Sequence, residues 1–286
     1  MKKLNIIFIG GLTNGQIVLD YLGSNTYVNV PLVLTYPKHH NVPRYIELIK
    51  PNGNTMMEYN LDSNSILSKI AELEPDYIFV AGWSNILSAE LLEIPKYGTI
   101  GFHPSRLPND RGRSVLAWQI EDGYTKTSLS MFYYNEIPDC GDIIAQEKIK
   151  IEYNDYIADV LDKIDFATYN MMKAYFPMLR KRIAPRVKQD INEGNFRRLR
   201  TGIDSQINWD KNVDIIYNKI RAISKPYPGS IGIIGEEKYL IWKAIRCKPP
   251  AELRYKVPGN YILNINGFPT VRCRDGCLKI LDYEKL

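Results

Sequence analysis

Short apolar runs alternate with segments of helical spacing in the first part of the chain. Runs of this kind predict buried strands at residues 4–9, 28–35, 77–82 and 98–102. Helical spacing of apolar residues follows at 17–22, 62–74, 89–94 and 159–182. Strands that alternate with helices are typical of a parallel, Rossmann-like sheet. We therefore expect an α/β domain with a mostly parallel sheet over residues 1–200.

The pattern changes after about residue 200. One helix is predicted at 213–222, and Gly, Pro and Asn turns then separate short runs that predict strands at 239–242, 259–263, 270–273 and 277–281. Several short strands broken by such turns are typical of a small barrel. We expect residues 201–286 to form an OB-like β domain.

Composition narrows the class of protein only slightly. The net charge of +5 suits an anionic small molecule as well as RNA, and we expect the basic residues between 181 and 200 to form mostly a solvated face. No apolar stretch approaches the roughly 20 residues that cross a bilayer. The apolar start is too short for a signal peptide. We expect a cytoplasmic protein without a membrane partner.

Four cysteines raise the question of a metal site. Cys273 and Cys277 have a metal-like spacing, but no matching pair or nearby His completes a ligand set. Reduced thiols in a cytoplasmic protein account for them, and we predict no metal.

Parallel sheets bind ligands beyond the carboxyl ends of their strands, which directs attention to Gly11, Trp83 and His103. The glycine turn at 10–15 matches neither the dinucleotide fingerprint nor the P-loop, so a nicotinamide cofactor is excluded. We expect Gly11 to line a substrate cleft, with direct phosphate contact as the alternative.

His103 ends a predicted strand and opens a loop rich in Pro, Arg and Gly. A second polar loop, 137–142, follows the apolar run 129–134, and its Asp139 can meet His103 across neighbouring strand ends. A carboxylate beside an imidazole tunes its basicity and orientation, as proton transfer requires. The residues alone thus predict an acid–base site of unspecified chemistry.

A longer set of residues resembles the folate-dependent formyltransferase family. The segment His103-Pro104-Ser105-Arg106-Leu107-Pro108 leads to Arg111-Gly112 and then, 36 residues after the histidine, to Asp139-Cys140-Gly141. Residues 207–209, 220–222 and 226–229 also resemble the carboxy-terminal domain of methionyl-tRNA formyltransferases. The resemblance covers nearly the whole chain and is weakest from 37 to 62.

The resemblance implies transfer of a formyl group from 10-formyltetrahydrofolate to an amine. His103 would stabilise the tetrahedral oxyanion and shuttle protons, and Asp139 would hold His103 or take the amine proton through water. It also implies a folate site at Trp83, Asn85, Ile86, Leu87, Tyr134 and Ile137. Simple core packing of Trp83 remains an alternative.

One position departs from the family pattern. Gly101 stands where the family has an Asn whose amide polarises the formyl oxygen, and loss of such a donor costs roughly 10²–10³ in rate. Asn85 or Asn109 are candidate replacements. A chain that binds ligand without catalysis is the alternative from a different class.

Three acceptors are compatible with the resemblance. The segment 37–44 has few cations for gripping tRNA, which disfavours methionyl-tRNA and nucleic acid in general. Glycinamide ribonucleotide formyltransferases normally lack the second domain. We therefore favour a nucleotide-linked amino sugar.

Arg111 and Arg113 would pair with its pyrophosphate, and Gly11 and Ser105 would also contact this substrate. A structural role for Arg111, base stacking by Tyr133 or Tyr134, and a homodimer through the β-rich tail stay open.

Overall fold

A computed structural model describes residues 3–36, 46, 48, 55–57, 61 and 63–286 of the chain. The segment 37–44, whose few cations disfavour tRNA as a substrate, lies outside these residues. The chain divides into two compact units, each made of more than one stretch. One unit comprises residues 1–113, 127–149 and 162–197, and the other comprises 114–126, 150–161 and 198–286. The domain boundary at residue 200 stays a prediction.

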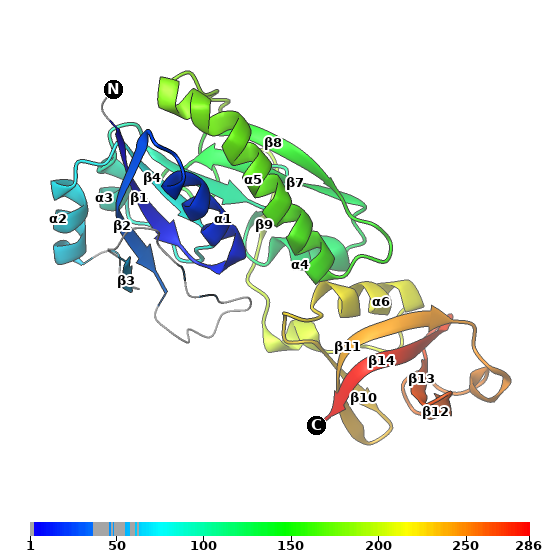
Figure 1. The fold of residues 1–286 in the computed structure, drawn as a ribbon. Helices are drawn as coiled ribbons and strands as arrows, with labels where there is room; N and C mark the ends of the chain where they lie inside the picture. The colour runs from blue at the N-terminus through cyan, green and yellow to red at the C-terminus, as the bar shows by residue number, and fades with distance from the viewer. Residues whose placement is uncertain (1–2, 37–45, 47, 49–54, 58–60, 62) are drawn as a thin grey trace. The chain divides into compact units, whose positions relative to one another are not determined.

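The first unit is built on a seven-stranded sheet with the order β3-β2-β1-β4-β5-β7-β8 (Figure 1). Its strands are β1 (Leu4–Gly10), β2 (Val28–Thr35), β3 (Thr55–Met57), β4 (Tyr77–Ala81), β5 (Thr99–His103), β7 (Lys126–Tyr133) and β8 (Ile143–Lys150). The pairs from β3 to β5 are parallel, and β5 pairs with β7 antiparallel. The prediction of a mostly parallel sheet is confirmed.

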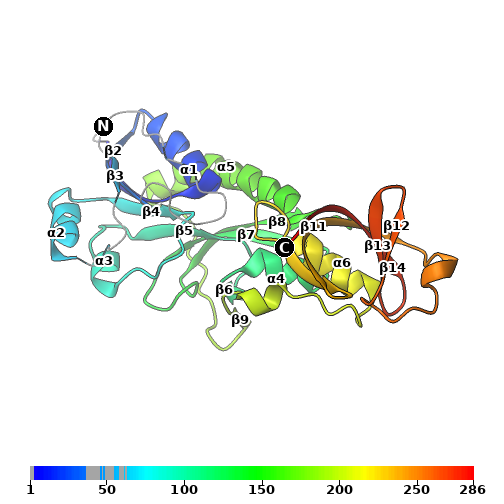
Figure 2. The same cartoon turned by 90° about the horizontal axis from the view of Figure 1, so that it is seen from below.

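Helices cover both faces of this sheet, which explains why its strands read as continuous apolar runs. They are α1 (Leu12–Gly23), α2 (Asn64–Glu72), α3 (Ala89–Glu93) and α5 (Ile157–Lys181). On one face Phe79 packs its ring near Phe176 of α5, and Tyr21 of α1 joins them. On the other, Ile7 and Val80 share a buried cluster with Ile66 of α2. Figure 2 shows the two layers of helices.

A two-stranded ribbon completes the first unit. It consists of β6 (Arg111–Gly112) and β9 (Phe196–Arg197), which pair in parallel although 85 residues separate them in the chain. Neither strand has a length or periodicity that sequence patterns detect.

The second unit holds a five-stranded antiparallel sheet with the order β10-β11-β14-β13-β12. Its strands are β10 (Ser230–Ile234), β11 (Glu237–Cys247), β12 (Ile262–Ile265), β13 (Phe268–Arg272) and β14 (Cys277–Lys285). Its other elements are α4 (Val115–Glu121), α6 (Val213–Ala222) and two short 3-10 turns, Gly202–Ser205 and Ala251–Leu253. A β-rich second domain is confirmed, and its OB-like closure into a barrel stays a prediction.

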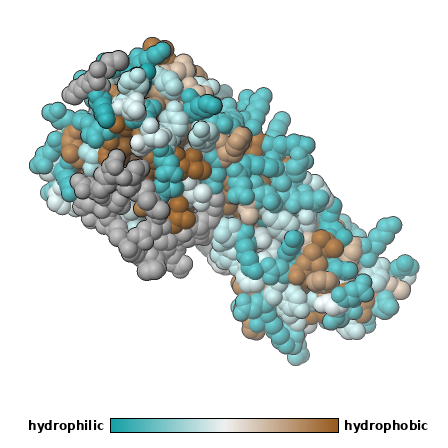
Figure 3. All heavy atoms as spheres, viewed as in Figure 1, coloured by the Kyte–Doolittle hydropathy of each residue, from teal (hydrophilic) through white to brown (hydrophobic). Residues whose placement is uncertain are grey.

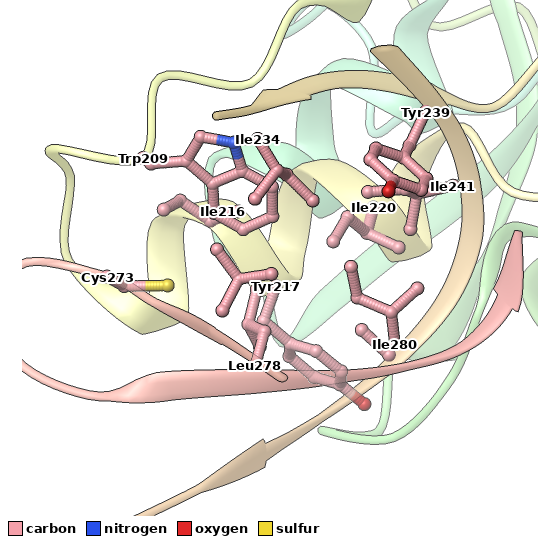
Figure 4. Packing of buried hydrophobic residues seen from close by; sticks show 12 residues of the cluster. Trp209, Ile216, Tyr217, Ile220, Ile234, Tyr239, Ile241, Cys273, Leu278 and Ile280 are labelled. Atoms are coloured by element: carbon pink, nitrogen blue, oxygen red, sulfur yellow. The ribbon is translucent and has the colours of Figure 1, made fainter. Parts of the chain in front are cut away.

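Helix α6 provides the core of the second unit. Its Ile216 and Ile220 lie against Ile241 and Leu278 of the sheet (Figure 4), with the Trp209 ring beside them. The Trp209 Nε1 donates to the Ile233 carbonyl at 2.8 Å, which satisfies its polar atom. Hydrophilic residues cover most of the face in Figure 3, and hydrophobic ones reach it in small groups. Apolar residues are therefore concentrated in separate interior cores.

Candidate active site

His103 is the last residue of β5 and is buried. Its Nε2 lies 2.7 Å from the backbone oxygen of Asp110. A carbonyl oxygen only accepts hydrogen bonds, so we assign a proton to Nε2. The other ring nitrogen, Nδ1, is then the one that can gain or lose a proton at this site.

Asp139 lies in the loop after β7 and faces that nitrogen. Its Oδ1 is 3.5 Å from Nδ1 of His103, and its Oδ2 accepts a 2.8 Å hydrogen bond from the Gly112 amide. The distance is long for a hydrogen bond but falls within the range of an ion pair when the imidazole carries two protons. The structure thus brings together the two side chains that the sequence pairs.

The segment 110–112 holds both members of this pair. The Asp110 carbonyl accepts from His103, and the Gly112 amide donates to Asp139. Asp110 and Asp139 both have left-handed backbone, with φ of 53° and 60°. Such conformations persist where the surroundings fix them, and they are frequent at functional sites.

Residues that come much later in the chain fix this segment. The Asp110 carboxylate accepts from Arg197 Nε at 2.6 Å and from Asn195 Nδ2 at 3.0 Å. The Asn195 side-chain oxygen in turn accepts from the Asp110 amide at 2.9 Å. Asp110 is therefore held through its backbone and its side chain, and its carbonyl is aimed at His103.

Gln189 joins the two segments that surround the His103–Asp139 pair. Its Nε2 donates to the carbonyls of Asp139 and Gly141, at 2.9 and 2.7 Å, while its Oε1 accepts from the Arg111 guanidinium at 3.1 Å. One amide side chain thus links the β6 segment to the Asp139 loop. Sequence reasoning missed Gln189, Asn195 and Arg197, because nothing in a polar stretch signals which distant loop it will contact.

Arg111 is fully buried, which favours its structural role. Its guanidinium donates to the backbone oxygens of Glu193 and Asp190, at 2.9 and 3.1 Å, besides Gln189. With its guanidinium buried and bonded to backbone oxygens, Arg111 is not available to a pyrophosphate, and the expected contact is wrong. Arg113 is exposed, as a contact to an anionic substrate requires.

Ser105 is also fully buried. Its hydroxyl donates to the Asn109 carbonyl at 2.7 Å, and its own carbonyl accepts from the Ser130 hydroxyl at 2.6 Å. These bonds shape the loop after His103, and the hydroxyl is not directed to a ligand. The expectation of substrate contact by Ser105 does not fit this placement.

Aromatic rings lie at the carboxyl ends of β1, β2 and β4. The Tyr36 ring stacks on Trp83, with centroids 4.4 Å apart, and its hydroxyl accepts from the Ser84 amide at 2.7 Å. A Cβ atom on Gly11 would lie 2.7 Å from that ring, so the turn after β1 needs a glycine there. Gly11 and Trp83 therefore both adjoin the Tyr36 ring at the strand ends.

The remaining residues expected to bind folate differ in exposure. Ile86 is 75% exposed and Ile137 is 43% exposed, so two large apolar side chains stand in strand-end loops without burial. Leu87 is buried in the core, which leaves only its backbone for a ligand, and Asn85 is half-buried. Tyr134 is half-buried against β5.

The four cysteines are free thiols, and burial raises the pKa of each. Within the described ranges, no group of three or more His, Cys, Asp or Glu side chains is placed to hold a metal ion. The same part of the chain contains no helix of the length and apolar character that crosses a membrane.

Comparison with known proteins identifies the family. Residues 2–175 match the model of formyl transferases, and residues 201–285 match that of the formyl transferase C-terminal domain. The chain therefore belongs to the formyl transferase family. The segment with Gln189, Asn195 and Arg197 lies between the two matched regions.

Individual relatives agree with this assignment. Over 225 residues (79% of this chain and 34% of the relative), the chain is 32% identical to the bifunctional polymyxin resistance protein ArnA of Wigglesworthia glossinidia brevipalpis. It thus spans about a third of that protein's length.

Two solved structures share the fold. An N-formyltransferase from Helicobacter canadensis, in complex with folinic acid and dTDP-3-aminofucose, has a TM-score of 0.70 at 17% identity, covering 99% of this chain and 100% of its own. HypX from Aquifex aeolicus in complex with tetrahydrofolic acid has a TM-score of 0.71 at 17% identity, covering 99% of this chain and 44% of its own.

Proposed function

We propose that the chain transfers a formyl group from 10-formyltetrahydrofolate to the amine of a nucleotide-linked amino sugar. The observation that carries this proposal is the pairing of His103 with Asp139, 3.5 Å apart at the end of β5, in a member of the formyl transferase family. The ligands named for the Helicobacter canadensis relative, a folate and a dTDP-linked amino sugar, support both substrates.

The reaction needs a group that stabilises an oxyanion and a group that accepts the amine proton, and this pair can provide both. The amine nitrogen attacks the formyl carbon, and the carbonyl electron pair moves to oxygen. The protonated His103 stabilises the resulting oxyanion, and Asp139 accepts the proton that the amine loses, through water. The electron pair on oxygen then re-forms the carbonyl as the bond from carbon to N10 breaks, N10 takes the proton that Asp139 accepted, and the products are a formamide and tetrahydrofolate.

The surroundings suit the two substrates. Ile86 and Ile137 offer exposed apolar surface at the strand ends, where the flat pterin would lie, and Trp83 lies in the same loop as Ile86. Exposed Arg113 follows the segment that holds the pair and would meet the pyrophosphate of the nucleotide.

Formyl transfer by the purified full-length chain tests the proposal. The chain is incubated with 10-formyltetrahydrofolate and a panel of dTDP-, UDP- and GDP-linked amino sugars, with charged initiator tRNA as a further acceptor. We expect a formamide on at least one amino sugar. Transfer to the tRNA alone would establish formylation of methionyl-tRNA instead, and folate binding without transfer to any acceptor would indicate a catalytically degenerate member.

A further inference from the structure

Gly101 lies two residues before His103 on β5, so both positions face the same side of the sheet. A Cβ atom at Gly101 would lie 2.0 Å from Cε2 of Tyr134 and 3.0 Å from its Cζ. The edge of the tyrosine ring therefore rests directly on the glycine Cα. Any side chain at position 101 excludes this ring position.

The Tyr134 ring is fixed in place. Its backbone amide donates to the Thr99 carbonyl at 2.8 Å, and its ring stacks on Phe132, with centroids 5.1 Å apart and planes 18° apart. It also packs against the buried cluster of β1, β4 and α3. These contacts hold the ring against Gly101, on the face of β5 that also carries His103.

The Tyr134 hydroxyl differs in its bonding from the hydroxyls of Tyr77 and Tyr156. Tyr77 donates to the Leu179 carbonyl at 2.9 Å, and Tyr156 donates to the Ala244 carbonyl at 2.7 Å. Buried phenols normally find such partners. Among the described residues, the Tyr134 hydroxyl has no hydrogen-bond partner. This leaves its donor available to a ligand.

Tyr134 keeps its proton under ordinary conditions. Burial raises the pKa of this phenol, and the nearby Asp139 carboxylate and Tyr36 raise it further. A phenol in this state donates a hydrogen bond but does not act as a base.

We propose that the Tyr134 hydroxyl is a further donor that, together with His103, stabilises the formyl oxygen during transfer, in a space that Gly101 keeps open for its ring. This inference rests on the function proposed above. As the amine adds, the carbonyl oxygen gains negative charge and the Tyr134 hydrogen bond strengthens, while the proton stays on the phenol. When the carbon–N10 bond breaks, the electron pair returns from oxygen to re-form the carbonyl.

This geometry also explains the departure at Gly101. The amide expected there from the resemblance would project into the volume that the Tyr134 ring fills. Asn109, considered above as a replacement donor, lies in an exposed turn where its backbone oxygen accepts from Ser105. The Tyr134 ring, in contrast, lies against Gly101 on the face of β5 that carries His103.

Tyr134→Phe removes one oxygen atom and keeps the ring. We expect kcat to fall by about 10²-fold, while the affinity for tetrahydrofolate and the melting temperature stay close to wild type. Tyr77→Phe is the matched control, since its hydroxyl bonds to the protein. It should lower the melting temperature and leave kcat unchanged.

A second experiment replaces the Tyr134 hydroxyl by an amide donor at position 101. Gly101→Asn alone should displace the Tyr134 ring and lower activity. In a Tyr134→Ala background, which vacates that space, adding Gly101→Asn should instead raise kcat, because the amide brings new donors to the same face. The sign of the Gly101→Asn effect thus depends on residue 134.

If the wild-type chain is active, two results would refute the role of Tyr134 and leave the proposed function standing. One is a kcat of Tyr134→Phe within about twofold of wild type, and the other is the same effect of Gly101→Asn in both backgrounds. A wild-type chain that transfers no formyl group to any acceptor would instead remove the proposed function and this inference together.

Discussion

The polar cluster around His103 and the charged cluster around Glu121 are equally well organised but differ in what their groups contact. In the second unit, Glu121 pairs with Arg200 at 2.6 Å and with Lys219 at 2.8 Å, and Lys219 also donates to the Asp204 carbonyl. Around His103, the contacts fix the backbone and aim the reactive groups, while the Tyr134 hydroxyl keeps its donor for a ligand.

The difference separates structural from catalytic polar residues better than residue type does. Arg111 and Arg113 are two residues apart in the same motif, yet one is fully buried among carbonyls and the other is exposed. The expectation of a solvated basic face fails similarly for Arg200, whose side chain is only 10% exposed and lies over the Trp118 ring. Contacts decide the role of each charge.

The largest effect should come from the catalytic pair itself. His103→Ala and Asp139→Ala should each lower kcat by about 10³-fold, since the proton transfer and the oxyanion stabilisation both depend on the two groups. Circular dichroism should show an intact fold. Substantial activity in either folded variant would contradict the assignment.

In the Glu121 cluster, we expect a substitution to lower stability and leave kcat unchanged. Glu121→Gln leaves Arg200 and Lys219 without their carboxylate in a nearly buried setting, at a cost of about 3 kcal/mol in the free energy of unfolding. Denaturant unfolding measures this loss. Below the melting transition kcat should equal that of wild type, and a large drop in kcat would show that the cluster does more than hold its unit together.

Gln189 lies between these two cases, because it is a structural amide that positions the catalytic pair. Gln189→Glu can still accept from Arg111 but can no longer donate to the carbonyls of Asp139 and Gly141. We expect kcat to fall about tenfold at a temperature where the protein is fully folded.

Asn5→Asp is the control for that variant. Asn5 is also a half-buried amide that bridges two segments, donating to the Leu73 carbonyl and accepting from Asn29, but it lies at the start of β1. It should lose stability without loss of kcat. Equal kinetic effects of both substitutions would mean that Gln189 has no positioning role.

The smallest effect should be one of pH on the second unit. The Arg198 guanidinium and the Thr201 amide hold the pKa of Asp204 well below its usual range. A carboxyl whose pKa is lower in the folded than in the unfolded state stabilises the fold above the unfolded value of about 3.9, and this stability is lost as the pH falls through the folded pKa. The melting temperature of Asp204→Asn should therefore be below wild type at pH 7, and the gap should narrow in acid. A constant gap would contradict this.

Apolar patterning predicted the parts of the fold that are regular and fully buried. The runs at 4–9, 28–35 and 77–82 are strands because both faces of the sheet are covered. It missed β6 and β9, two-residue strands whose pairing is set by tertiary contacts. The sequence motif predicted which residues meet at His103. It did not predict that Gln189 would join their loops or that a tyrosine would fill the space over Gly101.

Transfer by the His103–Asp139 pair is tested by following an isotopically labelled formyl carbon on 10-formyltetrahydrofolate by NMR. With the wild-type chain and a nucleotide-linked amino sugar, the label should move to the sugar nitrogen, and with Asp139→Ala it should stay on the carrier. Label that stays on the folate with wild-type protein and every acceptor, although the folate binds, would contradict the account.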